Sequence, residues 1–291
     1  MDEEIDLKDI FNHIWINKLF IFASSVFFFF VIFFYSLSLP DKYNSDAILK
    51  ITELENNVNS NQSLISSLAL LGQNSSSKDA SYIIELANSK SFLKNLLIND
   101  HIFLHLLCFE NYDENTESSI FVEDKEVKVL FDLRKKDIDF LTLKAMGTYR
   151  DIINFSYDID SNMLKIVSSH QSPIFSKEII EEIIYKLNYY EREKEINQAK
   201  ESINFLRKAY QENTSSDIKL SISNLITYHL EKEAMASVKN DYLVSYIDPP
   251  IKPISKSEPY RFLMAIFGSV FGFILSIILI FLRRFLFEEN K

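Results

Sequence analysis

Two uncharged stretches decide the fold: LFIFASSVFFFFVIFFYSLSL at residues 19–39 and FLMAIFGSVFGFILSIILIFL at residues 262–282. Each is 21 residues long and contains no charged side chain. A helix of that length spans roughly 30 Å, the thickness of the hydrocarbon core of a membrane. Because a helix satisfies its own backbone hydrogen bonds in lipid, both stretches predict membrane-spanning helices. The chain between them then forms one domain on one side of the membrane.

Each stretch has an alternative interpretation that the sequence argues against. A cleaved signal peptide would begin with a basic region, but residues 1–18 carry five acidic residues against Lys8 and Lys18. The first apolar stretch also exceeds the ~7–15 residues of a signal-peptide core. A buried core helix rarely offers so many apolar positions around every face, which argues for a span at the second stretch. We therefore expect tails at residues 1–18 and 283–291 and a head at 40–261.

Charge indicates the orientation and excludes some partners. Lys18 precedes the first span, and Arg283 and Arg284 follow the second. The positive-inside rule therefore places both tails in the cytoplasm and the head on the opposite side of the membrane. The chain carries −10; the first 18 residues contribute −3 and residues 283–291 contribute +1, which leaves −8 for the head. An acidic head does not attract nucleic acid or anionic lipid. The single cysteine, Cys108, excludes an intramolecular disulfide.

The head reads as a mixed α/β domain of 222 residues, enough for a sizeable core. Residues 60–108 have a helical pattern with a polar break at 73–78, and residues 109–136 give no clear pattern. Other stretches predict strands, two of them flanking a turn as a hairpin. These strands are 43–51, the hairpin 152–157 and 164–168, and 242–247.

A long helix is the second informative feature. Ser172 and Pro173 predict its N-cap and first position, and neither glycine nor proline interrupts residues 174–212. Such a helix would be ~55–60 Å long. A returning helix is expected to reach residue 238. An apolar seam follows the long helix in steps of three and four, and it packs either two helices of one chain or helices of neighbouring subunits. Both alternatives stay open for the seam residues, Ile196, Ala199, Ile203, Leu206 and Tyr210.

The return to the membrane has two further signals. Residues 248–259 contain Pro249, Pro250, Pro253 and Pro259, and they predict a stiff, extended connector. Inside the second apolar stretch, small residues recur every four positions and allow close approach of another helix in lipid. They are Gly268, Gly272 and Ser276.

Signals for catalysis are weak. No phosphate-binding glycine loop and no H-E-x-x-H pair occurs. His101, His105 and Cys108 stand at positions i, i+4 and i+7 and are three ligand types that zinc accepts, with a fourth required from elsewhere. Their apolar neighbours favour ordinary helix packing instead. We therefore expect no enzyme, no cofactor and no metal.

The order of these features resembles the Wzz-type chain-length determinants, the polysaccharide co-polymerases of bacterial inner membranes. The resemblance covers most of the chain. One departure is Glu258-Pro259-Tyr260-Arg261, where the family has a Ser-Pro-Lys block. The matching residues are Ile5-Asp6-Leu7 through Trp15 and Lys18, Pro40-Asp41-Lys42-Tyr43 with Ala47, Ala234-Met235-Ala236 through Asn240-Asp241-Tyr242 to Ile247-Asp248-Pro249, Pro250-x-x-Pro253, and Gly268 with Gly272.

The resemblance implies a non-enzymatic regulator that sets the length of a lipid-linked glycan, such as O-antigen, made by a separate membrane polymerase. It also implies a ring-like homo-oligomer with long helices projecting from an α/β part near the bilayer, either as a scaffold for polymerase or as a measuring surface. An adaptor for capsule or exopolysaccharide export, working with a separate tyrosine kinase, has the same topology. A two-span sensor or channel subunit is a third reading, but the spans lack the charged residues of a pore.

Overall fold

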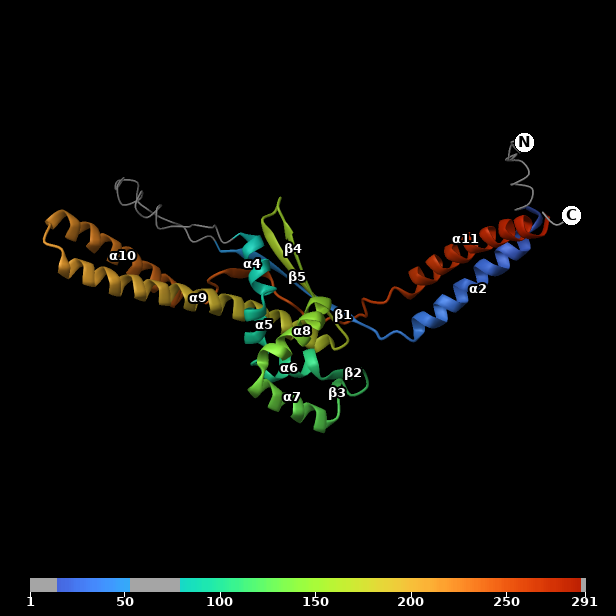
Figure 1. The fold of residues 1–291 in the computed structure, drawn as a ribbon, viewed down its shortest axis with the longest axis horizontal. Helices are drawn as coiled ribbons and strands as arrows, with labels where there is room; N and C mark the ends of the chain where they lie inside the picture. Colours follow the sequence, from blue (N-terminus) through green and yellow to red (C-terminus); the bar gives the residue numbers. More distant parts are fainter. Residues whose placement is uncertain (1–14, 53–78, 289–291) are drawn as a thin grey trace. The chain divides into compact units, whose positions relative to one another are not determined.

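The computed structural model describes residues 15–52 and 79–288, with side chains placed up to residue 283. The chain divides into two compact units, one of residues 1–42 and 255–291 and one of residues 43–254. Figure 1 shows the paired helices of the first unit and the α/β head of the second. Two helices flanking an α/β head confirm the predicted fold class.

The first unit consists of α2 (Lys18–Leu37) and α11 (Arg261–Glu288), which pack against each other in antiparallel directions. Both are long and apolar enough to cross a membrane. Large side chains on both are exposed, as Phe22 (69%) and Phe267 (66%) show, and this suits helices that face lipid. The second helix runs past the predicted end at residue 282, because Arg283 and Arg284 close the apolar stretch without breaking a helix.

A four-stranded antiparallel sheet forms the centre of the head, in the order β4-β5-β1-β6. Along β1, alternate residues are buried, and the exposed side of the sheet carries an ion pair of 2.8 Å between Lys165 Nζ and Asp46 Oδ2. The partly alternating pattern thus predicted β1 correctly, and β6 begins two residues later than expected. The strands are β1 (Tyr43–Ile51), β4 (Ile153–Asp158), β5 (Met163–His170) and β6 (Val244–Asp248).

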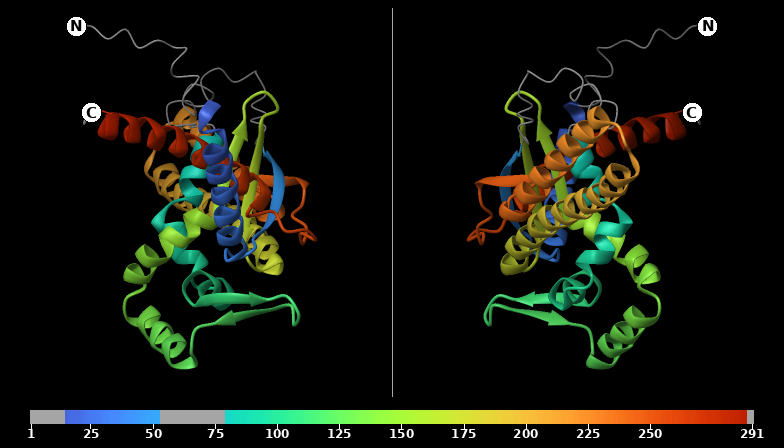
Figure 2. Two further views of the ribbon diagram at one scale, coloured as in Figure 1. Left: turned by 90° about the vertical axis from the view of Figure 1, so that its right-hand side faces the viewer. Right: turned by 90° about the vertical axis from the view of Figure 1, so that its left-hand side faces the viewer.

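One face of the sheet is covered by the first half of α9 (Pro173–Glu212), which contacts β1, β5 and β6. The predicted cap is present, since Ser172 Oγ accepts a hydrogen bond of 3.3 Å from the N–H of Phe175. Beyond the sheet, α9 pairs with α10 (Ser216–Val238) as an antiparallel hairpin, and Figure 2 shows the two helices side by side. Lys232 Nζ and Glu195 Oε1 join them at 3.1 Å.

The rest of the head is built from short elements that complete the core. The region predicted as helical, residues 60–108, contains three short helices, and its part at 60–78 lies outside the described residues. Residues 109–136, which gave no pattern, form a β-hairpin and a helix, and a further helix precedes β4. These elements are α4 (Ala80–Ala87), α5 (Lys90–Leu96), α6 (Asp100–Leu107), β2 (Phe109–Asp113), β3 (Ser118–Phe121), α7 (Asp124–Lys136) and α8 (Ile138–Ile152).

Candidate functional site: the paired spans and the helical hairpin

The contact between α2 and α11 is built on the two glycines of the small-residue face. A Cβ added to Gly268 would lie 2.6 Å from Cγ1 of Ile32, and one added to Gly272 would lie 2.8 Å from Cβ of Phe28. Real Cβ atoms essentially never approach so closely. Only glycine therefore permits this separation of the helices, and the partner of the small-residue face is the first span of the same chain.

Hydroxyl groups add hydrogen bonds across the same contact. Ser24 Oγ donates to the carbonyl oxygen of Gly272 at 3.2 Å, and Ser25 Oγ donates to that of Ser269 at 2.9 Å. The hydroxyls of Ser25 and Ser269 are also 2.9 Å apart. Ser276 is buried, and its hydroxyl donates to the carbonyl of Phe273 in its own helix. Interhelical hydrogen bonds in lipid contribute ~0.6–2 kcal/mol each, so glycine packing and serine bonding act together.

The chain that leaves α2 is tied to the chain that enters α11. Asp41 accepts hydrogen bonds from Lys256 Nζ at 2.7 Å and from Arg261 Nη2 at 2.6 Å. The backbone N–H of Lys42 donates to the carbonyl of Glu258, and the N–H of Ser257 donates to that of Lys42. Sequence reasoning gave Asp41 no role, although opposite charges next to the two predicted span ends were a signal for it.

The proline connector is extended and is held to the head. Its residues between β6 and Glu258 form neither helix nor strand, and Pro250 is buried while Pro249 is exposed. The carbonyl of Ile251 accepts a bond of 2.8 Å from Ser45 Oγ, and Lys252 Nζ pairs with Glu117 Oε2 at 2.7 Å. Pro253 and Pro259 are half-buried. Stiffness predicted from the prolines is thus accompanied by side-chain anchors.

The apolar seam of α9 is divided between the inside and the surface of the hairpin. Ile203 is 4% exposed and Ala199 is 2% exposed, so the contact of α9 with α10 within one chain occupies that part of the seam. Ile196 and Leu206 are half-buried, and Tyr210 is 41% exposed. The structure contains one chain, so a role of these residues in binding a partner helix stays a prediction. Ile203 is buried and is not accessible to such a partner.

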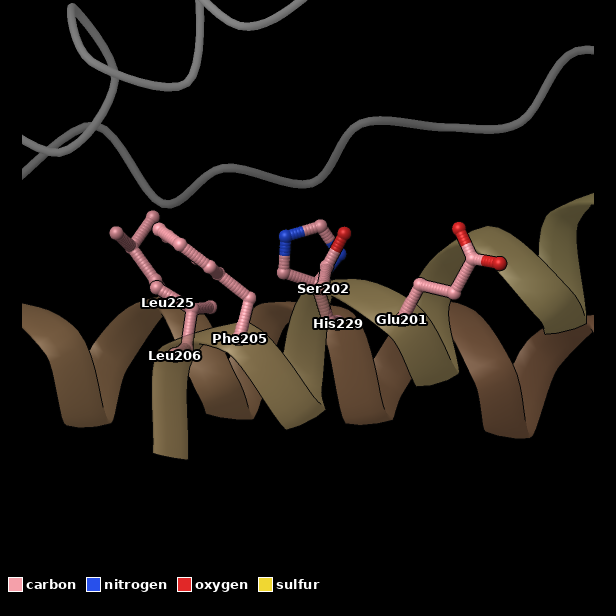
Figure 3. Close-up of a pocket in the computed structure, with 6 residues that line it drawn as sticks. All are labelled: Glu201, Ser202, Phe205, Leu206, Leu225 and His229. Atoms are coloured by element: carbon pink, nitrogen blue, oxygen red, sulfur yellow. The ribbon is translucent and has the colours of Figure 1, made fainter. Parts of the chain in front are cut away.

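A shallow hollow of about 350 Å³ lies on the hairpin between α9 and α10 (Figure 3). Phe205 on its rim is 71% exposed, and burial lowers the pKa of His229. Within the described part of the chain, no hydrogen bond links Ser202 to His229. Three of its six lining side chains are apolar and three are polar. The lining residues are Glu201, Ser202, Phe205, Leu206, Leu225 and His229.

A buried polar cluster anchors the root of the hairpin, and sequence reasoning missed it. Asn188 Nδ2 donates to the carbonyl of Val244 at 2.9 Å, and its Oδ1 accepts from the N–H groups of Leu243 and Val244. Glu191 is 2% exposed and accepts from Tyr82 Oη and from Lys194 Nζ. Both residues continue the buried face of α9 in place of isoleucine or leucine. Polar residues at apolar positions were therefore the available signal.

The three residues considered as metal ligands do not form a metal site. Across residues 15–52 and 79–288, no group of three or more His, Cys, Asp or Glu side chains is arranged to hold a metal ion. Both ring nitrogens of His105 already have protein partners, the carbonyl of His101 and the hydroxyl of Ser119, each at 3.0 Å. Burial lowers the pKa of His105 to about 4 and raises that of the Cys108 thiol. His105 stacks on Phe175 with ring centroids 4.1 Å apart, which is core packing.

One family model matches the N-terminal part of the chain. Residues 3–99 match the family model "Wzz: Chain length determinant protein", and this region includes α2 and β1. The chain resembles the Wzz-type chain-length determinants. No curated protein matches it.

Solved structures of polysaccharide co-polymerases match over longer stretches at low identity. A full-length bacterial polysaccharide co-polymerase is 11% identical and aligns over 98% of this chain and 99% of its own, with a TM-score of 0.39. A fragment of WzzB, a polysaccharide co-polymerase from Salmonella Typhimurium, is 12% identical over 75% of this chain and 100% of its own, with a TM-score of 0.32.

Proposed function

We propose that the chain regulates the length of a surface polysaccharide, with the O-antigen of lipopolysaccharide as the expected glycan. It would act as a ring-like homo-oligomeric scaffold in the bacterial inner membrane, beside a separate glycan polymerase and its lipid-linked polysaccharide. The observation that carries this proposal is the Wzz match at residues 3–99. It is combined with two predicted spans that pack closely at Gly268 and Gly272 and with a head that contains a 40-residue helix.

The proposed orientation places the head in the periplasm and both termini in the cytoplasm. Its support is the basic side chains at the outer ends of the spans, Lys18, Arg283 and Arg284. A regulatory role without catalysis is supported by the neutral, core-packed His105. Such a protein acts by positioning its partners, so subunit assembly and the geometry of the hairpin matter more than any single reactive group.

The test is the surface-glycan ladder of a strain that lacks this protein, run beside the parent and a complemented strain. A clustered modal length that collapses to a smooth decay of short chains is expected, and complementation restores the cluster. An unchanged ladder with loss of capsule or secreted polymer would instead establish the export adaptor. If no surface glycan changes, the proposal is wrong.

A further inference from the structure

A strip of exposed tyrosines lies at the root of α9, where the helix passes the edge strand β6. Tyr185 and Tyr189 are 60% and 44% exposed, and their rings stack with centroids 6.2 Å apart and planes 23° from parallel. Tyr246 of β6 is 39% exposed. We call Tyr185, Tyr189 and Tyr246 the tyrosine strip.

Contacts of Asn188 and Arg192 place the chain that leads to Tyr246 beside the part of α9 that carries Tyr185 and Tyr189. The chain from Asn240 to Tyr246 runs antiparallel to α9, since Arg192 Nη1 donates to Asn240 Oδ1 at 3.5 Å and Asn188 bonds Leu243 and Val244. Nearer the N-terminus of α9, burial and the carboxylate of Glu181 raise the pKa of Tyr246 to about 12.

Arg192 also holds the strip in place. Its guanidinium carbon lies 5.5 Å from the centroid of the Tyr189 ring, and the stack of Tyr189 on Tyr185 extends the row. Aromatic rings fixed in this way lose little rotamer entropy when a ligand covers them, so the surface is organised before binding.

Polar groups flank these rings and indicate the class of ligand. The negative charges of Glu181 and Asp241 help to raise the pKa of Tyr246. The Asn240 amide oxygen accepts a hydrogen bond from Arg192. The centres of protein–protein interfaces are depleted in Asp and Glu, so the two carboxylates near Tyr246 favour a ligand rich in hydroxyl groups. A sugar ring offers an apolar C–H face to an aromatic ring and hydroxyl groups to neighbouring carboxylates and amides. With −8 on the head, an acidic polymer would be repelled.

From this arrangement we propose that the tyrosine strip binds an uncharged stretch of polysaccharide, with sugar rings lying against the exposed parts of Tyr185 and Tyr189. The inference rests on the proposed function, because it assigns the glycan of that function a place on this chain. It makes the root of α9 a contact point for the growing polymer in addition to any scaffold role.

The test measures binding of a defined probe to the full-length protein in mild detergent. The probe is lipid-free polysaccharide released from the parent strain by mild acid and fractionated by size, with polygalacturonate as the anionic comparator. Tyr185→Ala with Tyr189→Ala is expected to weaken binding at least about tenfold, whereas Tyr185→Phe with Tyr189→Phe keeps most of the affinity. Tyr157→Ala, at a tyrosine of β4 that is 37% exposed, is the matched control and should bind as the parent does.

Several outcomes would overturn the inference. They are absence of binding to the parent protein, equal binding by the alanine variant, and equal loss in the Tyr157 control. A change in oligomer mass with unchanged glycan binding would make the strip a protein interface and also overturn it. Protection of Cys108 from thiol reagents checks that each variant is folded, because this cysteine is fully buried. A ladder that collapses in the deletion strain while the parent protein fails to bind the probe refutes this inference and leaves the proposed function standing.

Discussion

Gly272→Ala tests whether the spans are held at a separation that only glycine allows. The added Cβ would lie 2.8 Å from Cβ of Phe28 and 3.0 Å from the carbonyl oxygen of Ser24, whereas ordinary contact begins at 3.4 Å. The helices must therefore move apart by about 0.6 Å. Because a carbonyl oxygen and a Cβ cannot rotate away, no change of rotamer relieves the clash. The same shift stretches the bond of 3.2 Å from Ser24 Oγ to Gly272 beyond hydrogen-bond range.

The cost follows from these two losses. Overpacking a close contact costs ~1–3 kcal/mol, and a lost interhelical hydrogen bond adds up to ~1 kcal/mol. We expect a destabilisation of ~2 kcal/mol, which is a factor of about 30 in the equilibrium between packed and separated spans.

A disulfide across the two helices provides the assay. The hydroxyls of Ser25 and Ser269 are 2.9 Å apart, so cysteines at both positions, in a Cys108→Ser background, lie close enough to form a disulfide. The yield is measured in full-length protein while SDS is added to a mild detergent. Gly272→Ala should lower the SDS fraction at which cross-linking falls to half. Gly147→Ala is the control, because a Cβ there meets nothing within 4 Å. Identical midpoints for the Gly272 variant and the parent would refute the reasoning.

Three further predictions concern the head. Gly147→Ala should raise the free energy of unfolding by ~0.5–1 kcal/mol in urea titrations, because it removes backbone freedom from the middle of α8 without a clash; a loss of stability would contradict this. Asn188→Ala should cost ~3 kcal/mol, because it leaves two buried backbone N–H groups and one carbonyl of the chain at β6 without their partner, and an unchanged urea midpoint would rule out that anchoring role. Burial lowers the pKa of His105 from 6.5 to about 4, so the unfolded chain binds a proton in this interval that the folded chain does not, and stability should fall by ~3 kcal/mol as pH drops from 6.5 to 4. His105→Phe should remove that contribution from the pH dependence of urea unfolding, and a slope equal to the parent's would count against it.

Several elements could be predicted because their determinants are local in the sequence. The two spans follow from uncharged stretches of membrane length, and β1 follows from its partial alternation. The bounds of α9 follow from the Ser172–Pro173 start and from the polar break at Asn213–Ser216. In contrast, residues 109–136 form two short strands and a helix, α7, in which no residue is fully buried. Their sequence therefore has neither a hydrophobic periodicity nor a long apolar stretch from which these elements could be predicted.

The sequence by itself determined which faces are able to pack, and the tertiary structure decided against what they pack. Gly268 and Gly272 indicated close approach of a helix, but only the fold shows that the helix is α2 of the same chain. The seam of α9 permitted either an intrachain or an intersubunit contact, and the fold places Ile203 inside the hairpin with α10. His101, His105 and Cys108 have the spacing of metal ligands along the chain. However, His105 hydrogen-bonds Ser119 and stacks on Phe175, and both partners come from other elements. Spacing along a chain fixes a shared face, whereas the partners of that face come from segments distant in sequence.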